Sequence, residues 1–439
     1  MSTSITPTTP RDFLDDLKVH DLFHQATDEP GLRKHLATGK RRGYAGFDPT
    51  ADSFTIGNMV PMMLLAHLQR AGHTPVILSG GGTGLIGDPS GKSAERTLMT
   101  EETVRANVEA QKKIFSKVID FDDKANPPIV VNNNDWLGKL GYLEVLRDVG
   151  KHFSVNMMIQ KDSVKSRLES RDQGISYTEF SYMILQAYDF AHLHRSMGVT
   201  LQMGGSDQWG NIVAGGDLIR RASPGDDKVA AFGLTCPLIT KADGGKFGKS
   251  EKGAVWMTAD RTSPYAFYQF WLNAADADIP RFLRTFTFLS ADELNSILAA
   301  HATNPGAREA HRTLARTVTE MIHGKTEMDA AEAAAKALFS GEIGSLPEAT
   351  LAEIFAEVPS SQHAKAALEG EGMSILDVLV STALAASKRE AKEFLQNGSV
   401  SVNGNKVGPD DRLKTTHLLH GHTIAIRRGK KNWHVVRFG

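Results

Sequence analysis

The chain has 439 residues, which is enough for two to four domains with a substantial hydrophobic core. Hydrophobic residues make up 41%, charged residues make up 23% and the net charge is −1, so the composition excludes a membrane protein and a uniformly basic nucleic-acid binder. No apolar run approaches the roughly 18 residues that a membrane span needs, and the start, "MSTSITPTTPR", lacks the pattern of a signal peptide. With the lone cysteine Cys236, these features predict a soluble, cytoplasmic protein without a disulfide framework.

Short apolar strands alternate with amphipathic helices up to about residue 240. Residues 12–40 are expected to be helical, "RRGYAGFD" (41–48) to be a strand, and residues 55–73 to be a helix. Further strands are expected at "TPVILSGG", "PPIVVNN" and "VTLQMGG", and further helices at "TEFSYMILQAYDFAHLH" and "QWGNIVAGGDLIRR". The alternation predicts a parallel, doubly wound α/β sheet, in which ligands bind at the carboxyl ends of the strands.

After about residue 240 the sequence pattern changes, first to a helical segment and then, after a linker, to a small α+β module. Residues 262–345 are rich in alanine and leucine at helical spacing, which predicts a helical domain, and residues 346–372 are expected to be a linker. A small α+β pattern follows, with a helix at "KREAKEFLQNG", a hairpin at "SVSVNGNKV" and strands at "HTIAIRRG" and "WHVVRFG". Residues 373–439 carry 11 Lys and Arg against 5 Asp and Glu, so this module is expected either to bind a polyanion or to present a solvated basic face.

Two glycine-rich loops are candidates for binding phosphate groups. The first, "GGTGLIGDPSGKS" (81–93), has glycines at the G-x-G-x-x-G spacing, but Asp88 and Pro89 favour a turn, and its GKS comes one residue too early for a P-loop. It therefore either binds a phosphate or only turns the chain. The second, "GGKFGKSEKG" (244–253), places Lys246 and Lys249 among glycines, which suits either a mobile clamp on a polyphosphate or an exposed solubilising loop.

The helix expected over 178–195 aligns polar side chains on one face. Tyr182, Gln186 and Asp189 are spaced i, i+4 and i+7 among apolar neighbours. Burying a phenol, an amide and a carboxylate costs free energy unless each group finds a partner. The stripe therefore predicts either a pocket for a small ligand with hydroxyl and ammonium groups or a face turned to solvent.

Histidines occur in close groups, but the sequence does not predict a metal site. His20 and His24 are four residues apart, His192 and His194 form a second pair, and residues 417, 420 and 422 form a triplet. We find no acidic or cysteine companions at ligand spacing, so no protein-held metal is expected.

Taken together, these stretches resemble the bacterial tyrosyl-tRNA synthetases, a family of class I aminoacyl-tRNA synthetases. The resemblance covers nearly the whole chain and rests on "YAGFDPTADSFTIGN", "GGTGLIGDPSGKSAER", "NNNDWLG", "DVGKHFSVN", "YTEFSYMILQAYDF", "LQMGGSDQWGNI" and "KFGKS". It implies a Rossmann-like catalytic domain over 1–245, a KMSKS-type loop with a helical anticodon-binding domain over 246–345, the linker over 346–372, and an S4-like RNA-binding domain over 373–439.

The resemblance also implies an activity and residue roles. The chain would activate L-tyrosine with ATP and Mg²⁺ to tyrosyl-adenylate and pyrophosphate, and then transfer tyrosine to the 3′-terminal adenosine of tRNA(Tyr). The residues implied for tyrosine are Tyr44, Asp88, Tyr182, Gln186, Asp189 and Gln208, with Tyr44 and Asp189 on the phenol. Those implied for ATP and the adenylate are Gly46, Asp48, Thr55, Gly57, Asn58, Gly205, Asp207, Lys246, Lys249 and Ser250. Those expected to contact RNA are Lys388, Arg389, Lys392, Arg427 and Arg428. The family is homodimeric, which implies a homodimer with "DVGKHFSVN" at the subunit contact.

One motif departs from the family pattern. "TIGN" (55–58) stands where the family has its HIGH signature, and "KFGKS" (246–250) stands where class I enzymes have KMSKS. Thr55 keeps a hydroxyl donor and Asn58 an amide donor, so we expect both, with Lys246 and Lys249, to be catalytic. Two rivals remain: a tryptophanyl-tRNA synthetase, against which Asp189 and Tyr44 argue, and a non-catalytic RNA-binding relative, which the unusual Thr55 would suit.

Overall fold

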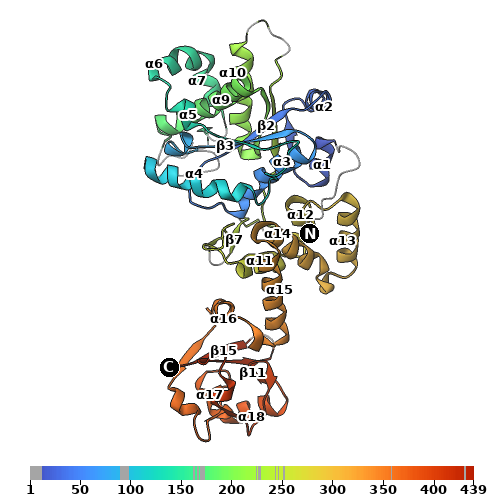
Figure 1. Cartoon of the computed structure of the whole chain (residues 1–439), viewed down its shortest axis with the longest axis vertical. Coiled ribbons are helices and arrows are strands. Elements are labelled where there is room, and N and C mark those ends of the chain that lie inside the picture. Colours follow the sequence, from blue (N-terminus) through green and yellow to red (C-terminus); the bar gives the residue numbers. More distant parts are fainter. Residues whose placement is uncertain are drawn as a thin grey trace. The chain divides into compact units, whose positions relative to one another are not determined.

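The structure is a computed structural model of the chain (Figure 1). It describes all residues except 1–11, 89–97, 162–163, 166–167, 169–173, 224, 226–228, 243, 246, 251–252, 357 and 430–431, and for residues 249–250 it describes the backbone alone. The chain forms two compact units, Met1–Gly324 and Lys325–Gly439. Within the described residues, no helix has both the length and the apolar character needed to cross a membrane.

The first unit is built on a six-stranded sheet with the strand order β1-β6-β5-β2-β3-β4. All neighbouring strands are parallel except for the edge strand β1, which is antiparallel to β6. The strands are β1 (Gln25–Ala26), β2 (Arg42–Phe47), β3 (Thr74–Ser79), β4 (Ile129–Asn132), β5 (Val199–Gly205) and β6 (Phe232–Cys236). The predicted doubly wound parallel sheet is confirmed, and the short strands β1 and β6 are additions to it.

The helices between the strands explain where a ligand can bind. Helix α3 (Met59–Arg70) connects β2 to β3, and α10 (Trp209–Ala222) connects β5 to β6 in the opposite direction along the sheet. Right-handed connections that diverge in this way place their helices on opposite faces. Figure 1 shows α9 (Tyr177–Met197) and α10 on one side of the sheet, with α1 (Phe13–Val19) and α3 on the other. The order reverses between β2 and β5, which is the position where such sheets bind ligands.

The expectation that residues 12–40 are helical is confirmed for two segments and is wrong for the residues between them. Helix α1 ends at Val19, and Asp21 has a φ of 53°, a conformation that a helix interior does not allow. Strand β1 follows and pairs with β6, and a second helix, α2 (Glu29–Ala37), then begins after Asp28, whose side chain accepts a hydrogen bond from the Gly31 N–H.

The remaining helices of this unit include α4 (Glu101–Phe115), α5 (Asn134–Leu137), α6 (Tyr142–Glu144), α7 (Val155–Met158), α11 (Pro264–Leu272), α12 (Ile279–Phe286), α13 (Ala291–Thr303) and α14 (Glu309–His323). The predicted helical character after residue 262 is therefore confirmed. The aromatic side chains of Trp271, Phe282 and Phe286 are buried and pack around Phe247, whose ring lies 5.1 Å from the ring of Phe282 and 5.2 Å from that of Phe286. This aromatic cluster connects the helices to the glycine-rich segment 244–253.

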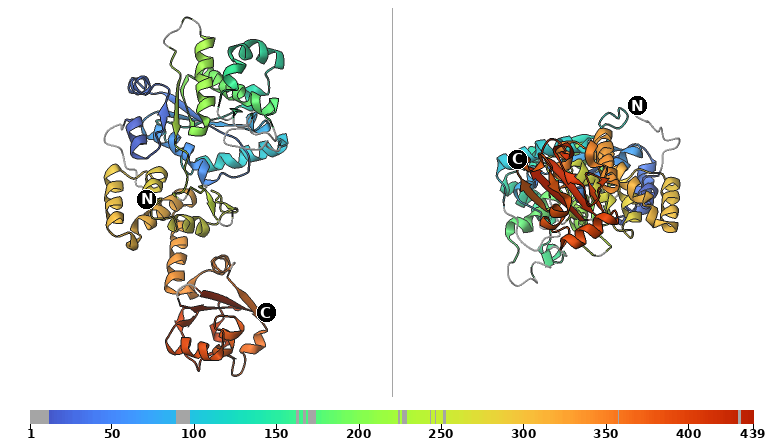
Figure 2. Two further views of the ribbon diagram at one scale, coloured as in Figure 1. Left: turned by 180° about the vertical axis from the view of Figure 1, so that it is seen from behind. Right: turned by 90° about the horizontal axis from the view of Figure 1, so that it is seen from below.

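The second unit begins with α15 (Lys325–Ser340) and contains a five-stranded sheet with the order β12-β11-β14-β15-β9, whose strands lie side by side in the right-hand view of Figure 2. The strands are β9 (Ser360–His363), β11 (Val400–Val402), β12 (Asn405–Lys406), β14 (Thr423–Arg428) and β15 (Asn432–Phe438), and the helices include α16 (Glu348–Ile354), α17 (Ile375–Ser381) and α18 (Lys388–Gln396). A small ladder of β10 (Met373–Ser374) and β13 (Arg412–Leu413) completes the unit. Strand β9 comes from the segment 346–372 and pairs with β15.

Candidate active site

A cavity of about 370 Å³ lies where the strand order reverses, at the carboxyl ends of β2 and β5. It is lined by most of the residues that the sequence singled out for tyrosine and nucleotide binding. These are Tyr44, Gly46, Asp48, Gly57, Asn58, Asp88, Tyr182, Gln186, Asp189, Gly205, Asp207 and Gln208. Residues up to 164 positions apart, from Tyr44 to Gln208, therefore meet in one place.

Tyr44 and Asp189 form one end of this cavity. Both side chains are about 1% exposed, and the Tyr44 hydroxyl has no hydrogen-bond partner among the described residues. Burial together with the nearby Asp189 carboxyl raises the pKa of Tyr44 well above its ordinary value, so the phenol stays protonated. A buried hydroxyl without a partner is costly, so this end of the cavity is suited to a ligand that supplies a polar group.

Asp189 is held by two donors that the sequence analysis did not single out. Asn133 Nδ2 donates to Asp189 Oδ2 at 2.9 Å, and Trp136 Nε1 donates to Asp189 Oδ1 at 2.7 Å. Burial raises the pKa of Asp189 to about 7, and these two hydrogen bonds act in the opposite direction. Asn133 and Trp136 belong to "NNNDWLG", a motif that carried the family resemblance, but only the fold shows that it reaches Asp189, more than 50 positions away.

A chain of hydrogen bonds connects Asp189, through Asn133, to Asp48 and Tyr182. Asn133 Nδ2 also donates to Thr83 Oγ1 at 3.0 Å, and Thr83 Oγ1 donates to Asp48 Oδ1 at 2.8 Å. The other oxygen of Asp48 accepts the hydroxyl of Tyr182 at 2.9 Å. Side chains from α9 and from the segments that follow β2, β3 and β4 therefore fix one another's orientation.

Amides and carboxylates form another wall of the cavity. Gln208 Nε2 donates to Asp88 Oδ2 at 2.8 Å and to Asp207 Oδ2 at 3.1 Å. Asn211 Nδ2 donates to Gln186 Oε1 at 3.0 Å. This wall holds two carboxylates, Asp88 and Asp207, and burial raises the pKa of Asp207. Such a wall can accept hydrogen bonds from a bound ammonium group.

The TIGN turn reaches the cavity through its second half. Residues 56–58 form a single 3-10 turn before α3, and Gly57 and Asn58 line the cavity. Thr55 is half-buried, is not among the described lining residues, and forms a β-bridge with Trp256. Its hydroxyl donates to Asn58 Oδ1 at 2.9 Å.

The KFGKS segment lies directly against the TIGN turn. Ile56 N–H donates to the Val255 carbonyl at 3.1 Å, and Val255 N–H donates to the Gly248 carbonyl at 2.9 Å. Gly248 has a φ of +79°, and a Cβ at this position would lie 3.3 Å from Ile56 Cγ1, so both backbone conformation and space favour glycine. Lys246 lies outside the described residues, and Lys249 and Ser250 are described only as backbone in β7 (Lys249–Ser250).

The residues expected to contact RNA belong to the second unit and have different surroundings. Arg427 Nη1 donates to the carbonyl of Phe339 at 3.2 Å, near the end of α15, and its guanidinium lies 5.1 Å from the Trp433 ring centre. Arg428 lies over Phe394, and Lys388 pairs with Asp377 at 2.5 Å. Arg389 and Lys392 are exposed on α18.

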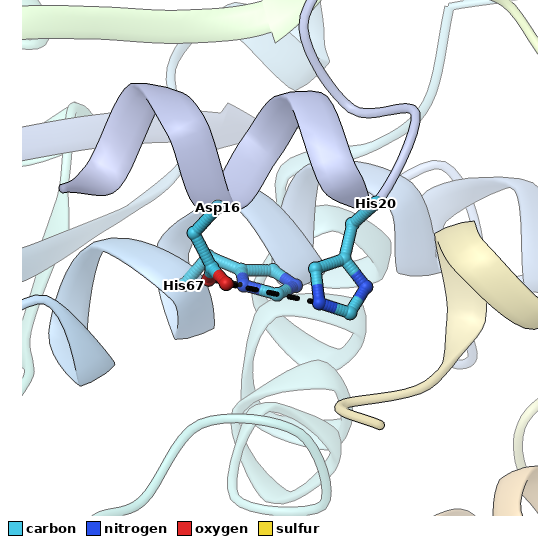
Figure 3. Close-up of side chains that lie close together, drawn as sticks. All are labelled: Asp16, His20 and His67. Carbon is cyan, nitrogen blue, oxygen red and sulfur yellow. Dashed lines mark hydrogen bonds and ion pairs between the residues drawn. The ribbon is translucent and has the colours of Figure 1, made fainter. Parts of the chain in front are cut away.

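The expectation that His20 has no acidic companion is wrong. Figure 3 shows Asp16 of α1 close to His20, which directly follows this helix, and to His67 of α3. Asp16 Oδ2 and His67 Nδ1 are 2.5 Å apart, and His20 Nδ1 donates to the carbonyl of Arg284 in α12 at 2.8 Å. Two ligands of a tetrahedral zinc ion are about 3.3 Å apart, so Asp16 and His67 are hydrogen-bonded directly. The cluster joins α1, α3 and α12.

Comparison with known families identifies the class of protein. Residues 36–340 match the family described as tRNA synthetases class I (W and Y), and residues 350–436 match the Tyrosine--tRNA ligase SYY-like C-terminal domain. The fold and its cavity are therefore those of a class I aminoacyl-tRNA synthetase.

Individual relatives identify the amino acid. The Tyrosine--tRNA ligase of Aliivibrio fischeri (strain MJ11) is 49% identical over 97% of this chain and 98% of its own length. That of Roseiflexus castenholzii is 48% identical over 97% of this chain and 99% of its own. A C-terminally truncated Aspergillus nidulans mitochondrial tyrosyl-tRNA synthetase is 32% identical, with a TM-score of 0.68 over 75% of this chain and 94% of that one. A Plasmodium falciparum tryptophanyl-tRNA synthetase, 14% identical with a TM-score of 0.52, shares the fold alone.

The chain belongs to the tyrosine--tRNA ligase family. The predicted activity is confirmed at this level: the chain is a ligase that activates L-tyrosine with ATP and transfers it to tRNA(Tyr).

Proposed function

We propose that the substrate phenol lies between Tyr44 and Asp189, where it accepts a hydrogen bond from one and donates to the other. The observation that carries this proposal is the buried Tyr44 hydroxyl, which has no partner among the described residues, facing a cavity that Asp189 also lines. Two oxygens of a carboxylate offer about four acceptor positions, and Asn133 and Trp136 fill two of them. Room therefore remains for the tyrosine hydroxyl.

The α-ammonium group of tyrosine would lie along the wall formed by Asp88, Gln186 and Gln208, with Tyr182 behind it. The carboxylate of Asp88 supplies the charge complementarity, and the Gln208 amide that donates to Asp88 holds it in place. The carboxylate of tyrosine then points toward the nucleotide side of the cavity, where Gly46, Asp48, Gly205 and Asp207 lie.

The nucleotide would lie across the carboxyl ends of β2 and β5, beside Gly57 and Asn58. Glycines let the phosphates approach the backbone closely. Mg²⁺ enters as part of the ATP substrate. In the first step the tyrosine carboxylate attacks the α-phosphate, and pyrophosphate leaves toward Lys246, Lys249 and Ser250. The positive charges of the two lysines offset the developing negative charge, and the Ser250 hydroxyl can donate a hydrogen bond. In the second step the terminal ribose hydroxyl of tRNA(Tyr) attacks the adenylate carbonyl. No side chain needs to form a covalent bond, because positioning and charge stabilisation lower both barriers.

We further propose that the helical segment 246–345 reads the anticodon and that the S4-like module 373–439 binds tRNA phosphates. The basic composition of the module and the exposed Arg389 and Lys392 support this role. The buried lone cysteine, Cys236, suits a reducing compartment, and we propose the cytoplasm.

We also propose a homodimer joined through the segment that follows β4. Large apolar side chains are exposed there over a short stretch, as an interface requires. They are Tyr142 (63% exposed), Leu143 (79%), Leu146 (45%), Val155 (60%) and Met157 (52%). Tyr177 (62% exposed), at the start of α9, adds to them, because its hydroxyl lies 3.4 Å from that of Tyr142. The motif "DVGKHFSVN" lies within this stretch, and a two-fold interface would bring the same patch of both copies together.

Substitution of Tyr44 by phenylalanine tests the phenol site. Tyr44→Phe keeps the ring packing on Phe190 (5.5 Å between centres) but removes the hydroxyl. Adenylate formation with tyrosine should then fall about 3- to 10-fold, while that with phenylalanine stays the same or rises. Equal losses for both amino acids would contradict the placement of the phenol at Tyr44.

A further inference from the structure

The TIGN turn fixes the orientation of the Asn58 amide. Asn58 Oδ1 accepts two hydrogen bonds from Thr55, one from its backbone N–H at 3.1 Å and one from its hydroxyl at 2.9 Å. A backbone N–H can only donate, so the amide atom that faces it must be the oxygen. The Nδ2 group, with its two donors, therefore points away from Thr55.

The two residues face different surroundings. Asn58 is exposed and lines the cavity beside Gly57, whereas Thr55 is half-buried and is not among the described lining residues. The backbone of Thr55 is fixed in turn by its β-bridge with Trp256 and by the hydrogen bond from Ile56 N–H to the Val255 carbonyl. Of the two residues, Asn58 is therefore the one whose side chain can contact a ligand in the cavity, and Thr55 is held by backbone contacts beside it.

We infer that Thr55 is a positioning residue for tyrosine activation, which acts through Asn58: its hydroxyl holds the Asn58 amide with both N–H donors toward the bound nucleotide. The inference deepens the proposed function, on which it rests. It also replaces the interpretation in which Thr55 itself donates to a phosphate oxygen, because the hydroxyl proton of Thr55 is already given to Asn58 Oδ1. In this uncharged turn, Thr55 then orients Asn58, and Asn58 donates to the nucleotide.

A double-mutant cycle separates the two interpretations, since residues that act as one unit give non-additive effects. Thr55→Val keeps the shape and the backbone N–H but removes the hydroxyl. We expect it to slow the single-turnover formation of tyrosyl-adenylate about 3- to 10-fold, the loss typical of one neutral hydrogen bond, with tyrosine affinity unchanged. Thr55→Ser restores the hydroxyl and should restore most of the rate.

The decisive measurement is Thr55→Val in an Asn58→Ala background. If Thr55 acts through Asn58, the double variant is as slow as Asn58→Ala alone. Asn58→Asp provides a matched control, because it keeps an acceptor for Thr55 but removes both amide donors, and it should be at least as slow as Asn58→Ala. If Thr55→Val slowed adenylate formation in the Asn58→Ala background by the same factor as in the wild-type background, the inference would be overturned. Direct contact between Thr55 and the nucleotide would then be favoured. Absence of tyrosine-dependent adenylation in the wild-type protein would instead contradict the proposed function itself, so the two failures are distinguishable.

Discussion

The ionisation of Asp189 should control how tyrosine affinity depends on pH. Burial raises the pKa of Asp189 to about 7, whereas the ordinary value is 3.8. The raised pKa means that Asp189 is a carboxylate mainly above pH 7 and a neutral acid below it. Only the carboxylate offers a strong acceptor to the substrate hydroxyl, so tyrosine affinity should fall as the pH drops below the pKa, by up to about tenfold per pH unit.

Equilibrium binding of L-tyrosine without ATP, measured from about pH 5.5 to about pH 9.5, checks this. Asp189→Asn removes the titrating group, so its affinity should be lower and nearly independent of pH. Trp136→Phe removes one of the two donors that lower the pKa of Asp189. A charge-assisted hydrogen bond contributes about 1.5–3 kcal/mol, so the midpoint should move upward by about one to two pH units. A flat wild-type profile, or a midpoint that moves downward in Trp136→Phe, would refute the reasoning.

Three further predictions concern other parts of the chain. Arg427→Ala should lower the stability of the second unit by about 1–3 kcal/mol, because the carbonyls near the end of α15 lose their donor. The double substitution of Arg389 and Lys392 by alanine should leave thermal unfolding nearly unchanged, but it should weaken tRNA binding and flatten its salt dependence. If Arg427→Ala weakened tRNA binding without changing stability, and the double substitution lowered stability without changing tRNA binding, the structural and RNA-binding roles of these residues would be reversed. Leu143→Glu places a charge at the most exposed apolar side chain of the proposed interface and should yield monomers in sedimentation experiments, and an intact dimer would place the contact elsewhere. Asp16→Asn should lower the free energy of unfolding in denaturant by about 3 kcal/mol, because His20 and His67 lose their buried carboxylate, and an unchanged midpoint would mean that the cluster adds no stability.

The periodicity of apolar residues predicted the main elements of the fold because it is a local property. The spacing of apolar residues could be recognised in strands β2 to β5 and in helices α3, α9 and α10, because these elements are long enough or regular enough. Strand β1 has two residues and is defined by its pairing with β6, so the expectation of helical structure over 12–40 missed it. Pairing between distant segments leaves no periodic signal.

Some residues of the candidate site could likewise be predicted from local spacing, and others could not. Tyr182, Gln186 and Asp189 could be recognised by their spacing on one helix, and the structure brings all three to the cavity. The support of Asp189 by Asn133 and Trp136 depends on where β4 ends relative to α9, which spacing along the chain does not reveal. The acidic partner of His20 could have been found from the sequence, because Asp16 of α1 stands four residues before His20, which directly follows this helix.

The measurement that tests the account most directly is pyrophosphate exchange into ATP by the full chain, run in parallel with tyrosine, phenylalanine and tryptophan. The cavity predicts exchange that depends on tyrosine, with strong discrimination against phenylalanine, because Tyr44 and Asp189 would otherwise lose a buried hydrogen-bond partner. Comparable exchange with phenylalanine or tryptophan, or no exchange with any of the three, would contradict the claim that this cavity selects and activates tyrosine.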